Sequence, residues 1–487
     1  MGAPHPPTPL RNLPDLRRRL IVQFRPDTPK TPFLRSKAQT PSILGGLITS
    51  SESAEAVLVI VDQDGALLCD MAGGSPALPR MRFDVRLPPM DSELTDRVRR
   101  ELELTTVVLE PLDFTTVVLL AADGARPVSA DGFAWHGHDA VTGQSLVLDA
   151  RTARSRPPAP DWFRPGWFER AESYIDGEIK AAGRLRLGPS RQIKHWSMSA
   201  VLRTPTDRGD MYLKAVLPRL AREPDITRYL ASLRTAPFAT ITAISPGDRW
   251  WLAEDFGGVD GRALSQEQRR ACLTQLVMVQ KETVHRGDEL IAAGCVTLTS
   301  ASLADGVRSI LARDDIWRAP RLAKNLGRAL TDEEADRLQA LTPYLVECAE
   351  RLDEAGIPVT IVHRDFHPGN VVMRDDGILL HDWSFATVTN PLFDLASWLH
   401  DASEPDAATY LDACFAAWAD IVAPERMRGA WRVAKPLSAV VELMKLIELA
   451  DIVGPDHDFN WLPMTYGWGR RLLNAAADPD LTINGWR

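Results

Sequence analysis

The sequence has little cysteine and lacks any long uninterrupted apolar run. Its 487 residues include five cysteines, odd in number and widely spaced: Cys69, Cys272, Cys295, Cys348 and Cys414. This pattern excludes a disulfide framework and predicts reduced core thiols in a cytoplasmic protein. No apolar stretch approaches the roughly 20 residues that a membrane-spanning helix needs, and the opening MGAPHPPTPLRNLPDLRRRL contains no apolar signal core. We therefore expect no membrane association.

The chain also lacks an excess of basic residues. Lys and Arg number 56 against 65 Asp and Glu, which gives a formal net charge of -9 without long acidic blocks. This balance argues against a nucleic-acid partner and favours small or cationic ligands. The hydrophobic share of 45% and charged share of 25% are typical of a soluble globular protein. Since 487 residues exceed one ordinary core, we expect two domains and a tail.

The domain boundaries follow from composition. Residues 1–50 are rich in Pro, Arg, Ser and Thr, which predicts a mostly flexible tail. Residues 51–150 predict a small mixed domain, with a hairpin at Asp64-Gly65, a helix over SELTDRVRRELEL and strands in TTVVLEPLDFTTVVLLAADG. Residues 151–164 are Pro-rich and predict a linker. Residues 165–487 form the second domain.

The second domain predicts strands followed by helices, an α+β arrangement. We expect a helix around WFERAESYIDGEI, strands HWSMSAVLRT and MYLKAVL, a helix REPDITRYLASL and a strand in RWWLAEDFGG. From residue 265 the pattern is mainly helical, with SQEQRRACLTQLVMVQKETV and then one helix over TDEEADRLQALTPYLVECAERLDEAG. Thr331 and Glu334 form a capping-box pattern at its start, and Gly356 is typical of its end.

Residues 363–383, HRDFHPGNVVMRDDGILLHDW, contain several carboxylate, amide and imidazole side chains that could take part in catalysis. Phosphoryl transfer needs a carboxylate that orients the attacking hydroxyl and oxygen ligands for magnesium, and Asp365, Asn370 and Asp382 have those types. The turn residues Asp376-Gly377 fold the apolar runs on either side into a hairpin. Asn370 and Asp382 are therefore expected to meet at the open end of that hairpin.

Three histidines in the same run raise the alternative of a metal site. His363, His367 and His381 are close in sequence. Zinc, however, needs three or four convergent ligands, and no cysteine or further histidine stands at ligand spacing. We expect His363 to hydrogen-bond the backbone of the loop instead.

HRDFHPGN, followed by HDW and NPLFDLA, resembles the aminoglycoside phosphotransferase and choline kinase family, small-molecule kinases with a two-lobed protein-kinase-like fold. The resemblance implies ATP and Mg²⁺ as cofactors, Asp365 as catalytic base, Asn370 and Asp382 as magnesium ligands, and Asp394 as a buried carboxylate that braces the catalytic loop. The sequence departs from the family pattern at two places: H-R-D replaces the more usual H-G-D, and Thr389-Asn390 replaces the usual Gly-Asp before proline. These departures bear on the conformation of the loop and on the subfamily, not on the reaction class.

Protein kinases share H-R-D and are the main competitor. They carry a long activation segment that docks a peptide. Only eleven residues separate Asp382 from Asp394 here, with no A-P-E among them. A small hydroxylated substrate is therefore favoured.

Upstream strands match the same resemblance. Lys214 alternates with apolar neighbours in MYLKAVL, and Glu223 stands near the start of the next helix, as in the lysine-glutamate pair of the kinase fold. No G-x-G-x-x-G loop is present; HWSMSAV takes its place, and the resemblance implies that Ser197, Ser199 and backbone amides cover the phosphates. WLAEDFGG resembles the adenine-binding hinge, with contacts near Glu254 and Asp255. The expected lobes span residues 165–258 and 259–487.

The first domain is similar to the Nudix hydrolase fold in AVLVIVDQDGALLCD followed by TDRVRREL. Arg100-Glu101 of the catalytic box remains, but Leu104-Thr105 replace its acidic pair, Val107 replaces its glycine, and Glu93 is one residue out of register. One carboxylate in register cannot support multidentate metal binding. We expect a small α/β Nudix-like domain that has lost hydrolase chemistry and serves binding or dimerisation; a homodimer stays open.

The acceptor and one alternative function stay open at this point. Three acidic residues follow the catalytic region: Asp401, Glu404 and Asp406. They could bind the amino groups of an aminosugar, or they could be solvated loop and helix-cap residues, which is the interpretation we favour. An aminosugar, aminoglycoside, sugar or amino alcohol all fit a small hydroxylated acceptor, and ATP is not distinguished from GTP. The alternative is a pseudokinase or nucleotide-binding scaffold with a non-catalytic Nudix-like module; intact Lys214 argues against it.

Overall fold

The computed structural model describes residues 22–23, 54–62, 66–83, 92–111, 116–121, 132–137, 147–148, 160–164, 166–233, 235–318, 329–400, 402–453 and 462–478. The contacts divide the chain into two compact units, the first including Thr49–Thr204 and the second including Pro205–Pro455. Nearly all of the predicted tail, the dipeptide Asp64-Gly65 and most of the predicted linker lie outside the described residues.

The first unit contains a mixed six-stranded sheet with the order β5-β6-β2-β3-β7, in which β4 also pairs with β2. Helix α2, Ser92–Leu102, places Leu94, Val98 and Leu102 at helical spacing in the core of this sheet. Strands β2 and β3 pair antiparallel, as the predicted hairpin requires. The strands span Ala54–Val61 (β2), Leu67–Asp70 (β3), Arg80–Phe83 (β4), Thr106–Pro111 (β5), Thr116–Ala121 (β6) and Phe133–His136 (β7), and a separate pair joins Val22–Gln23 (β1) to Val147–Leu148 (β8).

The same unit continues through α4, Trp167–Ala181, and a hairpin of β9, Arg191–Trp196, and β10, Ser199–Thr204. The prediction of one strand over HWSMSAVLRT was wrong, because Trp196 pairs with Ser199 and leaves a two-residue turn. The indole Nε1 of Trp196 donates to Ser199 Oγ at 2.8 Å across that turn.

A buried glutamine explains why this unit extends to Thr204. In β9, Gln192 Nε2 donates to the carbonyl of Val108 at 3.0 Å, and Gln192 Oε1 accepts from the Val108 N–H at 2.7 Å. Val108 lies where the register of β5 is irregular, which leaves its backbone groups available to a side chain. The boundaries 51–150, 151–164 and 165–487 stay a prediction.

In the second unit, β11, Met211–Val216, pairs antiparallel with β13, Trp251–Glu254, and β12, Ile241–Ile244, pairs with the other edge of β13. Helix α5, Glu223–Leu233, follows β11 after a short 3-10 turn. Strands β11 and β13 and helix α5 lie where the sequence predicts them, whereas β12 was not predicted.

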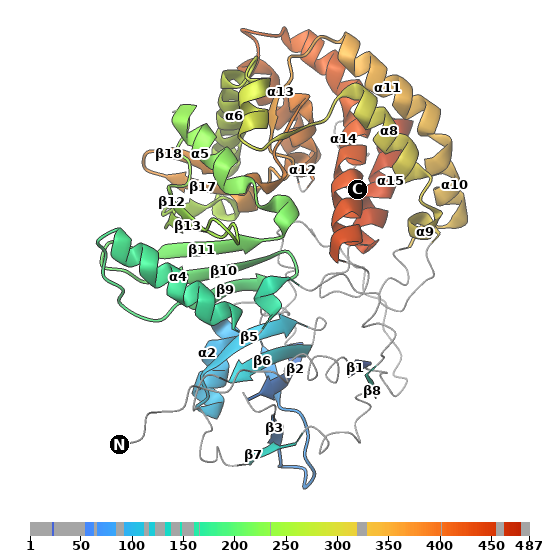
Figure 1. Cartoon of the computed structure of the whole chain (residues 1–487). Coiled ribbons are helices and arrows are strands. Elements are labelled where there is room, and N and C mark those ends of the chain that lie inside the picture. The colour runs from blue at the N-terminus through green and yellow to red at the C-terminus, as the bar shows by residue number, and fades with distance from the viewer. Residues whose placement is uncertain are drawn as a thin grey trace. The chain divides into compact units, whose positions relative to one another are not determined.

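The remainder of the second unit is mainly helical (Figure 1). The predicted helix over residues 331–355 is broken at Leu341, because Pro343 has no N–H to continue the hydrogen-bond ladder; its capping box at Thr331 and its end at Gly356 are as predicted. The helices span Gln266–Glu282 (α6), Gly287–Ala292 (α7), Ser300–Leu311 (α8), Asp314–Trp317 (α9), Asp332–Ala340 (α10), Thr342–Glu354 (α11), Leu395–Leu399 (α12), Glu404–Ala417 (α13), Pro424–Val453 (α14) and Leu462–Ala477 (α15).

Two small sheets carry the motif region. Strands β17, Val371–Arg374, and β18, Gly377–Leu380, form a hairpin, and β14, Val259–Asp260, pairs with β17. Arg374 pairs with Gly377, so Asp375-Asp376 form the turn rather than Asp376-Gly377. The second sheet has the order β15-β19-β16, with bounds Val296–Thr297, Thr387–Thr389 and Thr360–Val362.

The structure also bears on the cysteines and on membrane spans. All five cysteines are buried and free, as the sequence predicts. Among the described residues, no helix combines the length and apolarity that a membrane crossing requires.

Candidate active site

The catalytic-loop motif begins directly after β16, and Asp394 holds its backbone. Asp394 is 2% exposed and accepts hydrogen bonds from the N–H of His363 at 3.0 Å, the N–H of Arg364 at 2.8 Å and Gln280 Nε2 at 3.0 Å. Burial raises the pKa of Asp394 to about 7, although these three N–H donors act in the opposite direction. Arg364 adopts a φ of +60°, which favours glycine, so its conformation depends on such contacts.

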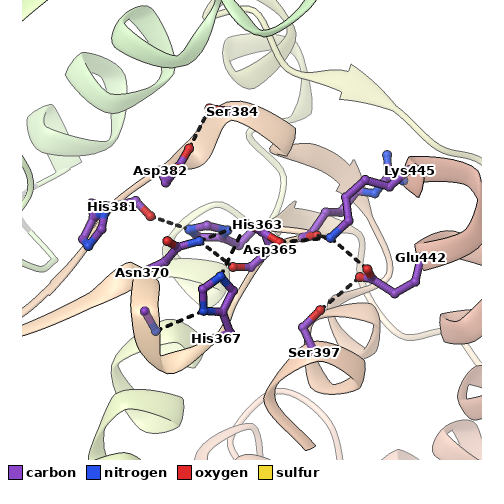
Figure 2. A network of polar contacts seen from close by, with 12 residues as sticks. His363, Asp365, His367, Asn370, His381, Asp382, Ser384, Ser397, Glu442 and Lys445 are labelled. Atoms are coloured by element: carbon purple, nitrogen blue, oxygen red, sulfur yellow. Dashed lines mark hydrogen bonds and ion pairs between the residues drawn. The ribbon is translucent and has the colours of Figure 1, made fainter. Parts of the chain in front are cut away.

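Asp365 and Asn370 form one hydrogen-bonded pair within the loop (Figure 2). The Nδ2 group of Asn370 donates to the Asp365 carbonyl at 2.9 Å and to its Oδ2 at 3.0 Å. The other carboxylate oxygen, Oδ1, lies 3.0 Å from Lys445 Nζ. Burial on its own would raise the pKa of Asp365, but the ammonium of Lys445 and the imidazole of His367 outweigh it and hold the pKa well below its usual range. Asp365 is therefore an ionised acceptor at neutral pH.

Lys214 joins two carboxylates on the other side of the hairpin. Its Nζ lies 2.8 Å from Glu223 Oε2 and 2.9 Å from Asp382 Oδ1. The Oγ of Ser384 lies 2.8 Å from Glu223 Oε2 and 2.7 Å from Asp382 Oδ1, so its one hydrogen is shared between the two acids. Burial lowers the pKa of Lys214, but the two carboxylates raise it by more, so the amine stays protonated. Burial raises the pKa of Asp382, but the ammonium of Lys214 outweighs this effect and holds the pKa below its usual range. The lysine-glutamate pair predicted from 214 and 223 is present.

The hairpin brings Asn370 and Asp382 to the same end, as its geometry requires. Val371 pairs with Leu380, and the N–H of His381 donates to the Asn370 carbonyl at 3.1 Å. Asp382 has a φ of +66°, which turns the chain sharply out of β18. Both side chains therefore belong to one rigid element.

The three histidines make local contacts. His363 Nε2 donates to the His381 carbonyl at 2.9 Å, and His367 Nδ1 accepts from the Gly369 N–H at 3.0 Å. The His381 ring lies 5.0 Å from the ring of Phe256. Burial lowers the pKa of His363 to about 4 and that of His381 to about 3, so both rings are neutral at pH 7. In the described part of the chain, no group of three or more His, Cys, Asp and Glu residues has a metal-binding arrangement.

Four further residues were predicted to contact the nucleotide. Ser197 and Ser199 belong to the first unit. At the end of β13, the N–H of Glu254 donates to the Thr240 carbonyl at 3.2 Å and the N–H of Asp255 donates to the Asp210 carbonyl at 3.1 Å. Those two amides are therefore used inside the fold, and a base at this segment would use other backbone groups.

Two acidic positions considered in the sequence have local partners. At the start of α13, Ser403 is the N-cap and its Oγ accepts from the Asp406 N–H at 3.4 Å, while the Asp406 carboxylate accepts from the Ser403 hydroxyl at 2.6 Å. Asp401 lies outside the described residues. In α2, Glu101 pairs with Arg97 at 2.6 Å, so the one remaining box carboxylate has a helical partner.

Sequence reasoning missed Lys445, Glu442, Ser384 and Gln280. Lys445 and Glu442 are 2% and 1% exposed, and they stand three residues apart in the apolar stretch SAVVELMKLIELA of α14. Charged residues in an otherwise apolar helical run are a signal for a buried ion pair, because each would be unfavourable alone. Ser384 and Gln280 carry no comparable signal. A-P-E does occur at 423–425, where it begins α14 and Glu425 is an exposed partner of Arg428.

We compared the chain with curated proteins and with solved structures. No curated protein matches the chain. Solved structures resemble it at low identity: a choline/ethanolamine kinase family protein from Mesorhizobium loti (14% identity, TM-score 0.45, 64% of this chain and 96% of that one) and choline kinase LicA from Streptococcus pneumoniae (12%, 0.41, 63% and 99%). A streptomycin-ATP-APH(2")-IIa complex is similar at 15% identity and a TM-score of 0.38, over 60% of this chain and 97% of that one.

The family model described as "Phosphotransferase enzyme family" matches residues 190–430. That span includes every residue of the cluster above except Glu442 and Lys445. Residues 190–430, just under half of the chain, are therefore similar to the phosphotransferase enzyme family, and the protein is an enzyme of the phosphotransferase class.

Proposed function

We propose that the protein transfers the terminal phosphate of ATP to a hydroxyl group of a small molecule such as an aminosugar, aminoglycoside, sugar or amino alcohol. The observation that carries this proposal is the convergence of a half-buried lysine paired with two acids and an ionised aspartate bonded to an asparagine, all within one unit. The similarity of residues 190–430 to the family supports the same reaction class. Because the similar solved structures include a choline kinase and a complex with streptomycin and ATP, we would test choline and streptomycin first as acceptors and ATP as the donor.

Lys214 is the proposed phosphate-binding cation. Its ammonium is protonated and held by Glu223, so it presents a fixed positive charge to the nucleotide phosphates. Its second ion pair, to Asp382, is the one that a bound phosphate and a metal ion would replace. Ser197 and Ser199 are proposed to cover the phosphates, and the carbonyl groups near Glu254 and Asp255 to contact the base.

Asn370 and Asp382 are the proposed magnesium ligands. Both hydrogens of the Asn370 amide go to Asp365, which leaves Oδ1 as the atom suited to a hard cation. Asp382 is ionised, and magnesium prefers such oxygen ligands. When bound, the ion would neutralise charge on the phosphates.

Asp365 orients the acceptor. Its depressed pKa makes it a weak proton acceptor at first, so its main contribution is to hold the hydroxyl in line with the phosphorus atom. As the new O–P bond forms and the bond to ADP breaks, the hydroxyl proton passes to the carboxylate and then to solvent. Asp394 and His363 support the loop and touch no reacting atom.

The Nudix-like domain is proposed to be a non-catalytic binding or dimerisation module. Its single in-register carboxylate, Glu101, is engaged by Arg97. A pseudokinase is the alternative, and it would bind nucleotide without transferring phosphate.

The test is a coupled ADP-release screen of aminosugars, sugars, amino alcohols and hydroxyamino acids. With an accepted substrate, Asp365→Asn and Asp382→Ala should each lower kcat by about a hundredfold or more while the unfolding transition is retained. Asp412→Asn, which removes only an exposed ion pair with Arg428, is the matched control and should keep full turnover. Unchanged turnover in Asp382→Ala contradicts the proposal, and so does magnesium-dependent nucleotide binding with no transfer to any acceptor.

A further inference from the structure

A buried lysine from outside the matched family segment touches the catalytic loop. Lys445 is 2% exposed and lies in α14, beyond the match at residues 190–430. Its ammonium has three partners: the Arg364 carbonyl at 2.7 Å, Asp365 Oδ1 at 3.0 Å and Glu442 Oε2 at 2.8 Å (Figure 2). Two of these contacts are hydrogen bonds, to the Arg364 carbonyl and to Asp365, and the contact with Glu442 is an ion pair.

The contacts fix the carboxylate of Asp365 from two sides. Lys445 holds Oδ1, while Asn370 Nδ2 holds Oδ2 at 3.0 Å. The lysine is itself oriented by Glu442, whose Oε1 accepts from the Ser397 hydroxyl of α12 at 3.1 Å. Both oxygens of the carboxylate therefore have a fixed direction before any substrate binds.

Lys445 also stabilises an unusual backbone conformation. Arg364 has a φ of +60°, and the groups flanking it are each bound: its N–H by Asp394 and its carbonyl by Lys445. A non-glycine residue in this region is strained, so the two hydrogen bonds offset the strain that the arginine of H-R-D introduces.

Stability alone does not account for this lysine. A buried ion pair is often no more stable than apolar residues of similar volume, because removing two charges from water is unfavourable. The residues next to it in α14, Met444 and Leu446, are apolar, and methionine is an apolar side chain of similar length with which to replace it.

We propose that Lys445 is a positioning residue for phosphoryl transfer, which orients Asp365 and the Arg364 peptide toward the acceptor, with Glu442 and Ser397 holding the lysine in place. The inference rests on the proposed function. Lys445 acts through Asp365 and touches no substrate atom.

The test compares Lys445→Met/Glu442→Gln with the wild type in the full chain. The double variant removes both buried charges, so it avoids the unpaired Glu442 that Lys445→Met alone would leave. We expect its kcat to fall about 30- to 100-fold, with the Kd for magnesium-ATP within about threefold, because Lys214 and Asp382 are untouched. The matched control is Lys435→Met, which removes another fully buried lysine of α14 that donates to the Asp478 carbonyl; it should keep kcat within about threefold.

A double-mutant cycle distinguishes positioning from general damage. In an Asp365→Asn background, the same two substitutions should lower residual turnover by less than about threefold, because the group that Lys445 orients is already removed. A full 30-fold loss in that background, or a double variant with wild-type kcat, overturns the inference. Absence of transfer by the wild type overturns the proposed function, and this inference with it; an active wild type with an equally active variant overturns the inference alone.

Discussion

His363 makes the stability of the catalytic loop depend on pH. The ring is fully buried, donates from Nε2 to the His381 carbonyl at 2.9 Å, and lies 4.4 Å from the ring of Trp383. Burial disfavours the imidazolium and lowers the pKa to about 4, against an ordinary value of 6.5. The unfolded chain therefore binds a proton at this histidine below pH 6.5, while the folded chain does so only near pH 4.

The sign of the effect follows from that difference. Between pH 6.5 and pH 4 the unfolded state binds more protons, so the free energy of unfolding decreases as the pH falls. One group with this shift contributes about 2–3 kcal/mol between pH 6.5 and pH 4.5. His363→Gln keeps an N–H donor for the His381 carbonyl but does not titrate, so its free energy of unfolding should lack this part of the decrease.

The measurement is urea denaturation of both proteins at several pH values, followed by tryptophan fluorescence. The unfolding free energy of His363→Gln relative to wild type should improve by about 2–3 kcal/mol on going from pH 6.5 to pH 4.5. Histidine-selective NMR of the native protein should show one ring that stays neutral down to about pH 4. A constant difference between the two proteins across this range, or an NMR titration near pH 6.5, refutes the reasoning.

Two further substitutions test the geometry around the site. Ser384→Ala removes the hydroxyl shared by the buried Glu223 and the half-buried Asp382 and should weaken magnesium-ATP binding about tenfold by calorimetry. Ser232→Ala, at an exposed helical serine, should not weaken it, and equal affinities of the Ser384→Ala variant and the wild type would contradict a role for the shared hydroxyl. Gly261→Ala places a Cβ on the Pro368 carbonyl of the catalytic loop and should lower both the melting temperature and kcat, while Gly287→Ala, which meets open space, should change neither. Wild-type turnover in Gly261→Ala would show that the loop tolerates displacement.

Local patterns accounted for most elements because short-range physics sets them. The capping box at Thr331, the alternation around Lys214 and the hairpin after Asn370 depend on neighbours in sequence, and each lies where it was predicted. The errors occurred where one detail decided a boundary: a two-residue turn after Trp196, and the break before Pro343 in a run that is otherwise helical.

Long-range partners were not predictable in the same way. Nothing in the sequence around Gln192 indicates a special role for its side chain. In the structure, both the oxygen and the nitrogen of its amide bind the backbone of Val108, and these bonds join β9 to the first unit, which extends to Thr204. The sequence shows Lys445 and Glu442 only as two charges three residues apart in an apolar helical run, and the contact of Lys445 with Asp365 joins residues 80 positions apart.

The sequence by itself determined the residue types and spacing of the phosphotransferase motif, because the loop and hairpin that hold Asp365, Asn370 and Asp382 form from consecutive residues. Only the tertiary structure decided that Lys445 of α14 contacts Asp365 and that Ser384 joins Glu223 to Asp382. A buried charge is tolerated only where the fold supplies its partner, and that partner comes from whichever element packs there.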